Sequence, residues 1–412
     1  MTKESGVSFI RNVGALLVGS GTQLVASVGG ALLTTLVLPV DQRGLMVIVV
    51  TIASMVALIG AAGIGNAYRH RHPGEVDQDA LSADFTTVSM VLIVVSGLGG
   101  AVACVAMAGL ADARLLEWNY VLGAALAASA QVATLLVTEA RFALGQFVEA
   151  SRWAAASAIV GFAGVAVALA VGGDAAAVIT SQACCQFVVV VAAAVASTRA
   201  RALVWASTSR RRAGVLLSHG MRSLVLPVAI VVISRFDRLV VAAFDTADAV
   251  AVYALAATVV EVARLAPTAI GQLATREVAT GLAWRAFRSR LLLATLAAAL
   301  VGIVLVASAF LIVVPVFGID YAESPFLAAV LLWSEVAYAV IVVANLAIIG
   351  GGWSTAALRL GIAAMGIAIP LYIAGAAIAG PFGVAWARLL VFVLIAVLML
   401  ASIRSRLARV AA

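Results

Sequence analysis

Ionisable side chains occur inside runs of residues that are otherwise apolar. Arg235, Asp237 and Arg238 stand within one such run. Glu261 and Arg264 stand three residues apart in the next, which places them on one face of a helix. An arginine can hold a phosphate or carboxylate through two parallel hydrogen bonds, whereas a carboxylate at membrane depth can relay a proton. The spacing therefore predicts a charged patch that binds an anion or couples to a cation.

The depths of these groups predict which of them meet. At 1.5 Å per residue, Arg235 lies roughly 13 Å below the outer end of its helix, and Glu261 lies roughly 18 Å below the same level. An arginine side chain can bridge that difference, so we expect Arg235 to reach Glu261. Glu261 and Arg264 are candidates for a substrate cavity, although a purely structural pair between the two helices is the alternative.

Further charges lie nearer helix ends or in later runs. Asp237 and Arg238 lie high in their helix and are interpreted, together with Arg388, as structural charge pairs. Glu335 lies in the middle of its run. It is either a coupling-ion carboxylate or the partner of Arg388, because an unpaired charge at this depth is costly.

The elements that carry these charges are membrane-spanning helices. Of 412 residues, 64% are hydrophobic and only 11% are charged, and the mean hydropathy is +1.16. A soluble domain is about a quarter charged, so this composition excludes an ordinary soluble protein. Twelve runs are long enough for the roughly 20 residues that span a bilayer. We predict an all-α polytopic membrane protein with two six-helix lobes of the same orientation, 1–198 and 223–412, joined by a basic cytoplasmic linker, 199–222.

The distribution of loop charge predicts the orientation. With both termini on one side, that side collects 19 of the 26 basic residues, and the opposite loops hold only Arg43 and Arg114. Cytoplasmic loops carry such an excess, so both termini are expected in the cytoplasm. The net charge of +7 thus reflects loop placement, and no nucleic-acid partner is expected. Heavy use of Arg, Ala and Val favours a bacterial source, and hence a bacterial cytoplasmic membrane with its lipids as surroundings.

Several function classes are excluded. No loop exceeds roughly 20 residues, and no GxxxxGK[ST] motif occurs, so the chain is not an ATP-driven pump on its own. The short outer loops also argue against an enzyme such as a glycosyltransferase. No metal-ligand spacing and no cofactor motif is found. Cys104, Cys184 and Cys185 lie in apolar runs, and we expect them to be buried and unpaired.

Short motifs resemble a known family. Ser234–Arg238 reads SRFDR, Tyr253-Ala254 follows, and the turn Phe317–Tyr321 reads FGIDY. Their order and spacing are similar to those of the polysaccharide-type flippases of the multidrug/oligosaccharidyl-lipid/polysaccharide exporter superfamily. Pro39–Gly44 after the first run also fits. The clearest motifs lie between about 220 and 325, and the resemblance covers most of the chain.

The resemblance implies two six-helix lobes around a central cavity and alternating access. It implies a cargo of oligosaccharide on a polyprenyl pyrophosphate. Arg11, Arg235 and Arg264 are then candidates for the pyrophosphate. Glycosyltransferases or a polymerase of the same pathway are candidate partners. Two alternatives stay open: a cation-coupled multidrug exporter of the same fold, and a non-transporting membrane scaffold for polysaccharide assembly.

Overall fold

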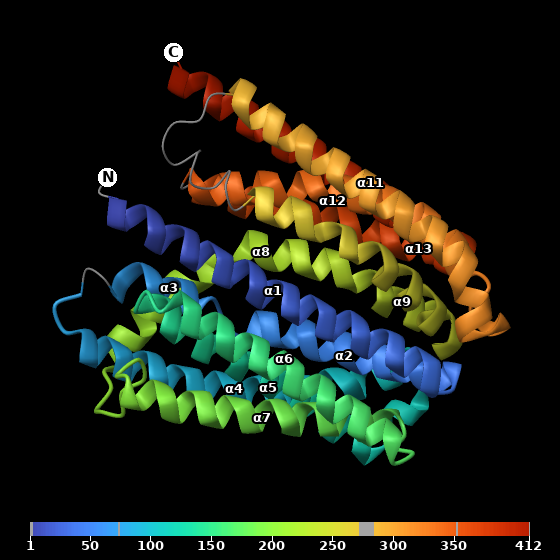
Figure 1. Ribbon diagram of the computed structural model, residues 1–412, viewed down its shortest axis with the longest axis horizontal. Helices are drawn as coiled ribbons and strands as arrows, with labels where there is room; N and C mark the ends of the chain where they lie inside the picture. The colour runs from blue at the N-terminus through green and yellow to red at the C-terminus, as the bar shows by residue number, and fades with distance from the viewer. Residues whose placement is uncertain (1–2, 73–74, 272–283, 352, 412) are drawn as a thin grey trace. The chain divides into compact units, whose positions relative to one another are not determined.

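The computed structural model is all-helical over the residues that it describes, 3–72, 75–271, 284–351 and 353–411 (Figure 1). The first helices are α1 (Lys3–Val37), α2 (Val40–Gly60), α3 (Ile64–Arg71), α4 (Gln78–Ala108), α5 (Trp118–Ala143), α6 (Phe147–Ala170) and α7 (Ala175–Arg199). The later ones are α8 (Arg210–Phe244), α9 (Ala247–Glu261), α11 (Trp284–Phe317), α12 (Ser324–Gly350) and α13 (Ser354–Ala411). Short 3₁₀ turns are η2 (Ala113–Leu116), η3 (Val262–Arg264) and η4 (Ile319–Tyr321).

The expected count of twelve spanning helices is confirmed for the described residues. Ten stretches are long and apolar enough to cross a membrane. The helix α8 is not among them because Arg235, Asp237 and Arg238 all lie within its apolar stretch, and α13 is counted once although it contains two helices. Its backbone leaves the helical region at Ala379 and at Gly380, where φ is +53°. Pro381 follows and cannot donate a helical hydrogen bond, so the chain turns there.

Contacts divide the chain into two compact units. Unit 1 comprises Met1–Leu38 and Val49–Leu224. In it α4 and α7 both pack on α5, α6 packs on α7, and α1 packs on α6. Small residues allow these close contacts: the Ser181 hydroxyl donates to the Gly164 carbonyl at 2.9 Å between α7 and α6. Figure 1 shows α4, α5, α6 and α7 running nearly parallel to one another.

The connection after α7 belongs to the core of unit 1. Ala202 and Leu203 are buried in the same apolar cluster as Tyr68 and Phe85. The side chain of Asp84 is fully buried and accepts hydrogen bonds from the Ser209 amide at 2.8 Å and Arg212 Nε at 2.6 Å. From Arg210 onward the expected linker is the first part of α8. The connection between α7 and α8 is therefore packed against unit 1 and hydrogen-bonded to it.

Unit 2 comprises Pro39–Ile48 and Val225–Ala412. Its α12 packs against α9, α11 and α13. The first turns of α2 join this unit by close contact: a methyl group added at Gly44 would lie only 1.8 Å from the Ala247 carbonyl oxygen. The two halves of α13 meet in the same way, where Gly375 and Gly383 face each other.

The cysteines depart from the expectation. All three are free, and Cys104 is buried, but Cys184 is exposed and Cys185 half-buried. Cys184 lies on the same side of α7 as Val188 and Val191, which are also exposed. The prediction of burial was wrong for Cys184 because a small apolar side chain suits a face toward lipid as well as a protein core.

Candidate functional site

A proline shapes the helix that carries Glu261 and Arg264. Pro267 has no backbone N–H, so the Ala263 carbonyl four residues earlier has no helical donor. The chain just before it tightens into η3, in which the Leu265 amide donates to the Val262 carbonyl. Tight turns inside a spanning helix are common at functional sites. Here the turn begins directly after Glu261 and ends on Arg264.

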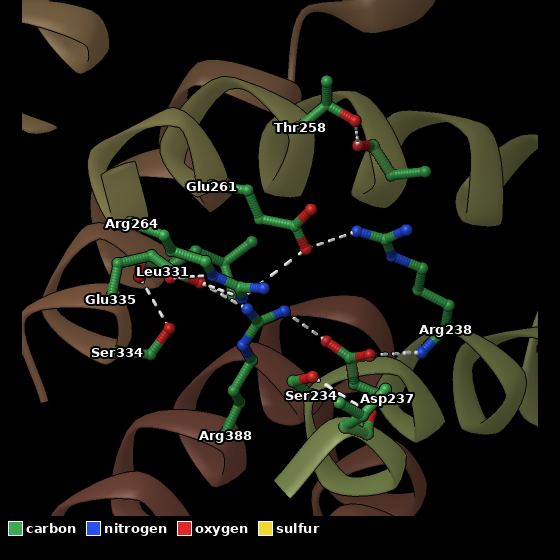
Figure 2. Close-up of polar contacts among 12 residues, drawn as sticks. Ser234, Asp237, Arg238, Thr258, Glu261, Arg264, Leu331, Ser334, Glu335 and Arg388 are labelled. Carbon is green, nitrogen blue, oxygen red and sulfur yellow. Dashed lines mark hydrogen bonds and ion pairs between the residues drawn. The ribbon is translucent and has the colours of Figure 1, made fainter. Parts of the chain in front are cut away.

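The innermost part of the site is an arginine between two carboxylates (Figure 2). Arg388 of α13 donates from Nη1 to Asp237 Oδ2 of α8 at 2.5 Å and from Nη2 to Glu335 Oε1 of α12. None of these three side chains has any exposed surface. Asp237 also accepts from the Tyr253 hydroxyl at 2.8 Å and from the Arg238 amide at 2.9 Å. The bridge thus joins three helices through fully buried charges.

A second layer lies nearer the surface of the unit. Arg264 donates two hydrogen bonds to the Glu335 carboxylate, from Nε at 2.5 Å and from Nη2 at 2.7 Å. Glu261 accepts from Arg238 Nη2 at 2.6 Å, and its oxygen lies 3.5 Å from Arg264 Nη2. The guanidinium of Arg264 stacks 4.3 Å from the centre of the Tyr338 ring. Glu261 and Arg264 keep 18% and 19% of their side-chain surface exposed, so this layer is the accessible edge.

The charges of this cluster do not cancel. It holds four arginines, Arg235, Arg238, Arg264 and Arg388, against the carboxylates Asp237, Glu261 and Glu335. Within the described chain, Arg235 makes no hydrogen bond and no ion pair within 4 Å. Its side chain is half-buried and interacts electrostatically with the charges of Arg238, Glu261 and Arg264. The described residues of the cluster therefore carry one formal positive charge in excess.

The structure brings together most of the residues predicted from the sequence but pairs them differently. Glu261 accepts a hydrogen bond from Arg238 and not from Arg235. The strongest partner of Arg264 is Glu335 rather than Glu261. Asp237 and Arg238 are both buried, and they pair with Arg388 and Glu261 respectively.

Two tyrosines belong to the site, Tyr253 and Tyr338, although the sequence analysis of ionisable residues in apolar runs did not predict them. Tyr253 appeared only within a family motif, and Tyr338 went unnoticed. Tyr338 lies three residues after Glu335, which is the spacing that could have revealed it. Arg11 lies in α1, but its side chain falls outside the described residues, so no contact of this candidate is assigned.

Solved structures share this architecture. A MATE multidrug resistance transporter in an inward-facing conformation is 15% identical, with 94% of this chain and 95% of that chain covered and a TM-score of 0.68. The lipid II flippase MurJ in an inward closed conformation is 10% identical, with 94% and 87% covered and a TM-score of 0.70. A MOP superfamily transporter from Pyrococcus furiosus is 14% identical, with 98% and 96% covered and a TM-score of 0.59. The chain has the MOP superfamily fold. No family model and no curated sequence matches it.

In unit 1, one face of α1 carries uncharged polar side chains. Ser20, Gln23 and Ser27 follow one another on one face of α1, and all three are exposed within the unit. Val18 and Val25, 70% and 73% exposed, lie on the opposite face. An amide or hydroxyl that faces lipid is costly, so the polar stripe suits a wet cavity and the valines suit lipid.

Proposed function

We propose that the chain is a membrane transporter that moves a lipid-linked oligosaccharide, carried on a polyprenyl pyrophosphate, across the membrane by alternating access. The fold supports a transporter rather than an enzyme, because it is shared with both drug transporters and a lipid II flippase. The observation that carries the choice of substrate is the excess cation of the buried cluster. Arg235, half-buried and without a direct ion pair among the described residues, is positioned to take a phosphate oxygen.

The polar stripe of α1 supports the same substrate. A sugar offers many hydroxyls and no charge, and Ser20, Gln23 and Ser27 offer uncharged donors and acceptors.

The pairing of the carboxylates in the cluster argues against a cation-coupled multidrug exporter. Such an exporter needs a carboxylate that exchanges protons or binds a cation. Among the described residues of the cluster, every carboxylate already accepts from at least one arginine, and Glu335 accepts from two. Glu335 is accordingly proposed as a structural partner of Arg388 and Arg264 rather than as a coupling site.

The loop charges support a location in a bacterial cytoplasmic membrane with both termini in the cytoplasm. A glycan carrier there would work beside the glycosyltransferases or polymerase of the same pathway.

The test is transport by purified protein in proteoliposomes that contain a fluorescent polyprenyl-pyrophosphate disaccharide. A charge-assisted hydrogen bond contributes about 1.5–3 kcal/mol, so Arg235→Gln should slow transport by roughly 10- to 100-fold. Arg235→Lys should recover part of the rate, because it restores the charge but not the two-pronged geometry. Arg359→Gln removes an exposed arginine on α13 and serves as the matched control.

Each alternative predicts a different result. A multidrug exporter would leave the lipid untransported but would expel a cationic dye, with Glu335→Gln abolishing that efflux. A scaffold would transport neither compound. Equal rates for Arg235→Gln and the unmodified protein would reject the assignment of the substrate phosphate to Arg235.

A further inference from the structure

A groove of about 610 Å³ opens beside the C-terminal end of α7 in unit 1. Arg141 of α5, Glu149 of α6 and Arg199 of α7 line its polar end. Ala192 and Val195 of α7 line its wall. The groove is separate in sequence and in chemistry from the charged cluster of unit 2. It combines a cationic end with an apolar wall.

The polar end of the groove is organised around a buried arginine whose position is set by hydrogen bonds. The Arg141 side chain is only 3% exposed. Its Nε donates to the Ser197 hydroxyl at 2.9 Å, and its Nη1 donates to Gln146 at 2.7 Å and to Glu149 at 2.5 Å. These bonds hold the guanidinium in place. Within the described chain its second terminal nitrogen, Nη2, makes no hydrogen bond, so one donor face of Arg141 is left over.

The charge of the groove favours an anion. Arg141 and Arg199 outnumber the single carboxylate, Glu149. The Glu149 side chain is 52% exposed, so water screens its charge. Arg199 lies in the last turn of α7, is exposed, and forms no ion pair with another described residue. Two guanidinium groups are therefore available to a phosphate.

The apolar wall continues along an exposed side of α7. Val188, Val191 and Val195 are 69%, 59% and 47% exposed, and with Arg199 they repeat every three or four residues on one face. The helix Ala175–Arg199 is long and apolar enough to span a membrane, so this exposed apolar face is suited to contact with hydrocarbon. From Val188 to Arg199 the helix rises roughly 16 Å, the reach of an acyl chain from its headgroup.

We propose that this groove binds an anionic phospholipid. Its phosphate lies between Arg199 and Arg141, and one acyl chain runs along the valines of α7. A basic pocket between spanning helices on the cytoplasmic side is suited to such a headgroup. The site stands independently of the transport cargo, because none of its residues belongs to the charged cluster.

Native mass spectrometry of the purified full chain tests the proposal with two probes, phosphatidylglycerol and phosphatidylcholine. The unmodified protein should bind phosphatidylglycerol more tightly. One surface arginine is worth about 1 kcal/mol, so Arg199→Gln should weaken phosphatidylglycerol binding roughly fivefold and leave phosphatidylcholine binding unchanged. Ala192→Trp fills the exposed wall and should weaken binding of phosphatidylglycerol without touching a charge. Arg211→Gln removes an exposed arginine from α8 and should have no effect.

Three results would overturn the proposal. Equal affinity for the two lipids would mean that the groove does not distinguish an anionic headgroup from a zwitterionic one. Unchanged binding in both Arg199→Gln and Ala192→Trp would place the lipid elsewhere. Full competition by millimolar inorganic phosphate or by the polyprenyl pyrophosphate alone would assign the groove to a soluble phosphate or to the cargo lipid. Melting curves of each variant would show that the fold is intact.

Discussion

Arg388 is the side chain on which the buried charges of unit 2 depend most. It contacts Asp237 at 2.5 Å and also contacts Glu335, and all three side chains are fully buried. Removing one partner of a buried ion pair costs about 3–5 kcal/mol, because the remaining charge is left without its counter-ion. In Arg388→Met, Glu335 keeps Arg264, but Asp237 keeps only the Tyr253 hydroxyl and a backbone amide. Most of the cost should therefore come from Asp237.

A double-mutant cycle isolates that contribution. Asp237→Asn alone should also destabilise unit 2, since Arg388 then loses one of its two carboxylates. In the double variant, Arg388→Met with Asp237→Asn, no unpaired charge remains at this position. The two losses should thus be strongly non-additive, with a coupling free energy at the upper end of the usual range, about 3 kcal/mol.

The assay is unfolding of the detergent-purified protein by denaturant, followed by tryptophan fluorescence, with abundance in the membrane as a second measure. Arg359→Met, at an exposed position on α13, is the control and should change stability by no more than about 0.5 kcal/mol. A stability of Arg388→Met equal to that of the control, or strictly additive losses in the double variant, would refute the reasoning.

Other predictions concern single features. Reporter fusions at Ala412 and within the connection after α7 should both report the cytoplasm, and an extracellular signal from either would reject the proposed orientation. Asp84→Ala removes two hydrogen bonds from that connection, so trypsin should cut after Arg201 about tenfold faster, as the loss of about 1.4 kcal/mol predicts; unchanged cleavage would mean that the apolar contacts alone hold it. Burial lowers the pKa of His72, so the unfolded chain takes up a proton first as the pH falls. Stability should then be complete above about pH 6.5 and decline below it, and His72→Phe should lessen the decline in acid melting curves. Pro267→Ala restores a helical donor to the Ala263 carbonyl, so we expect unchanged or higher thermal stability but slower transport, because Glu261 and Arg264 shift; an unaltered rate would show that η3 is not needed.

The sequence by itself determined the class of protein and the number of helices. Lipid offers no hydrogen bonds, so a span must satisfy its own backbone, and apolar runs of sufficient length become helices whatever surrounds them. The same physics made the charged residues of those runs conspicuous, since ionised groups are rare at that depth. Asp237, Glu261, Arg264, Glu335 and Arg388 were all found in this way.

Only the tertiary structure decided which charges meet. Asp237 and Arg388 are 151 residues apart, and no periodicity along the chain reports on such a distance. Depth along a helix predicted that Arg235 would meet Glu261, but Arg238, about one turn further along α8, donates to that carboxylate instead. Among the described residues of the cluster, Arg235 is the arginine without an ion pair. Which arginine is left unpaired depends on side-chain direction and helix packing, which one-dimensional spacing does not encode.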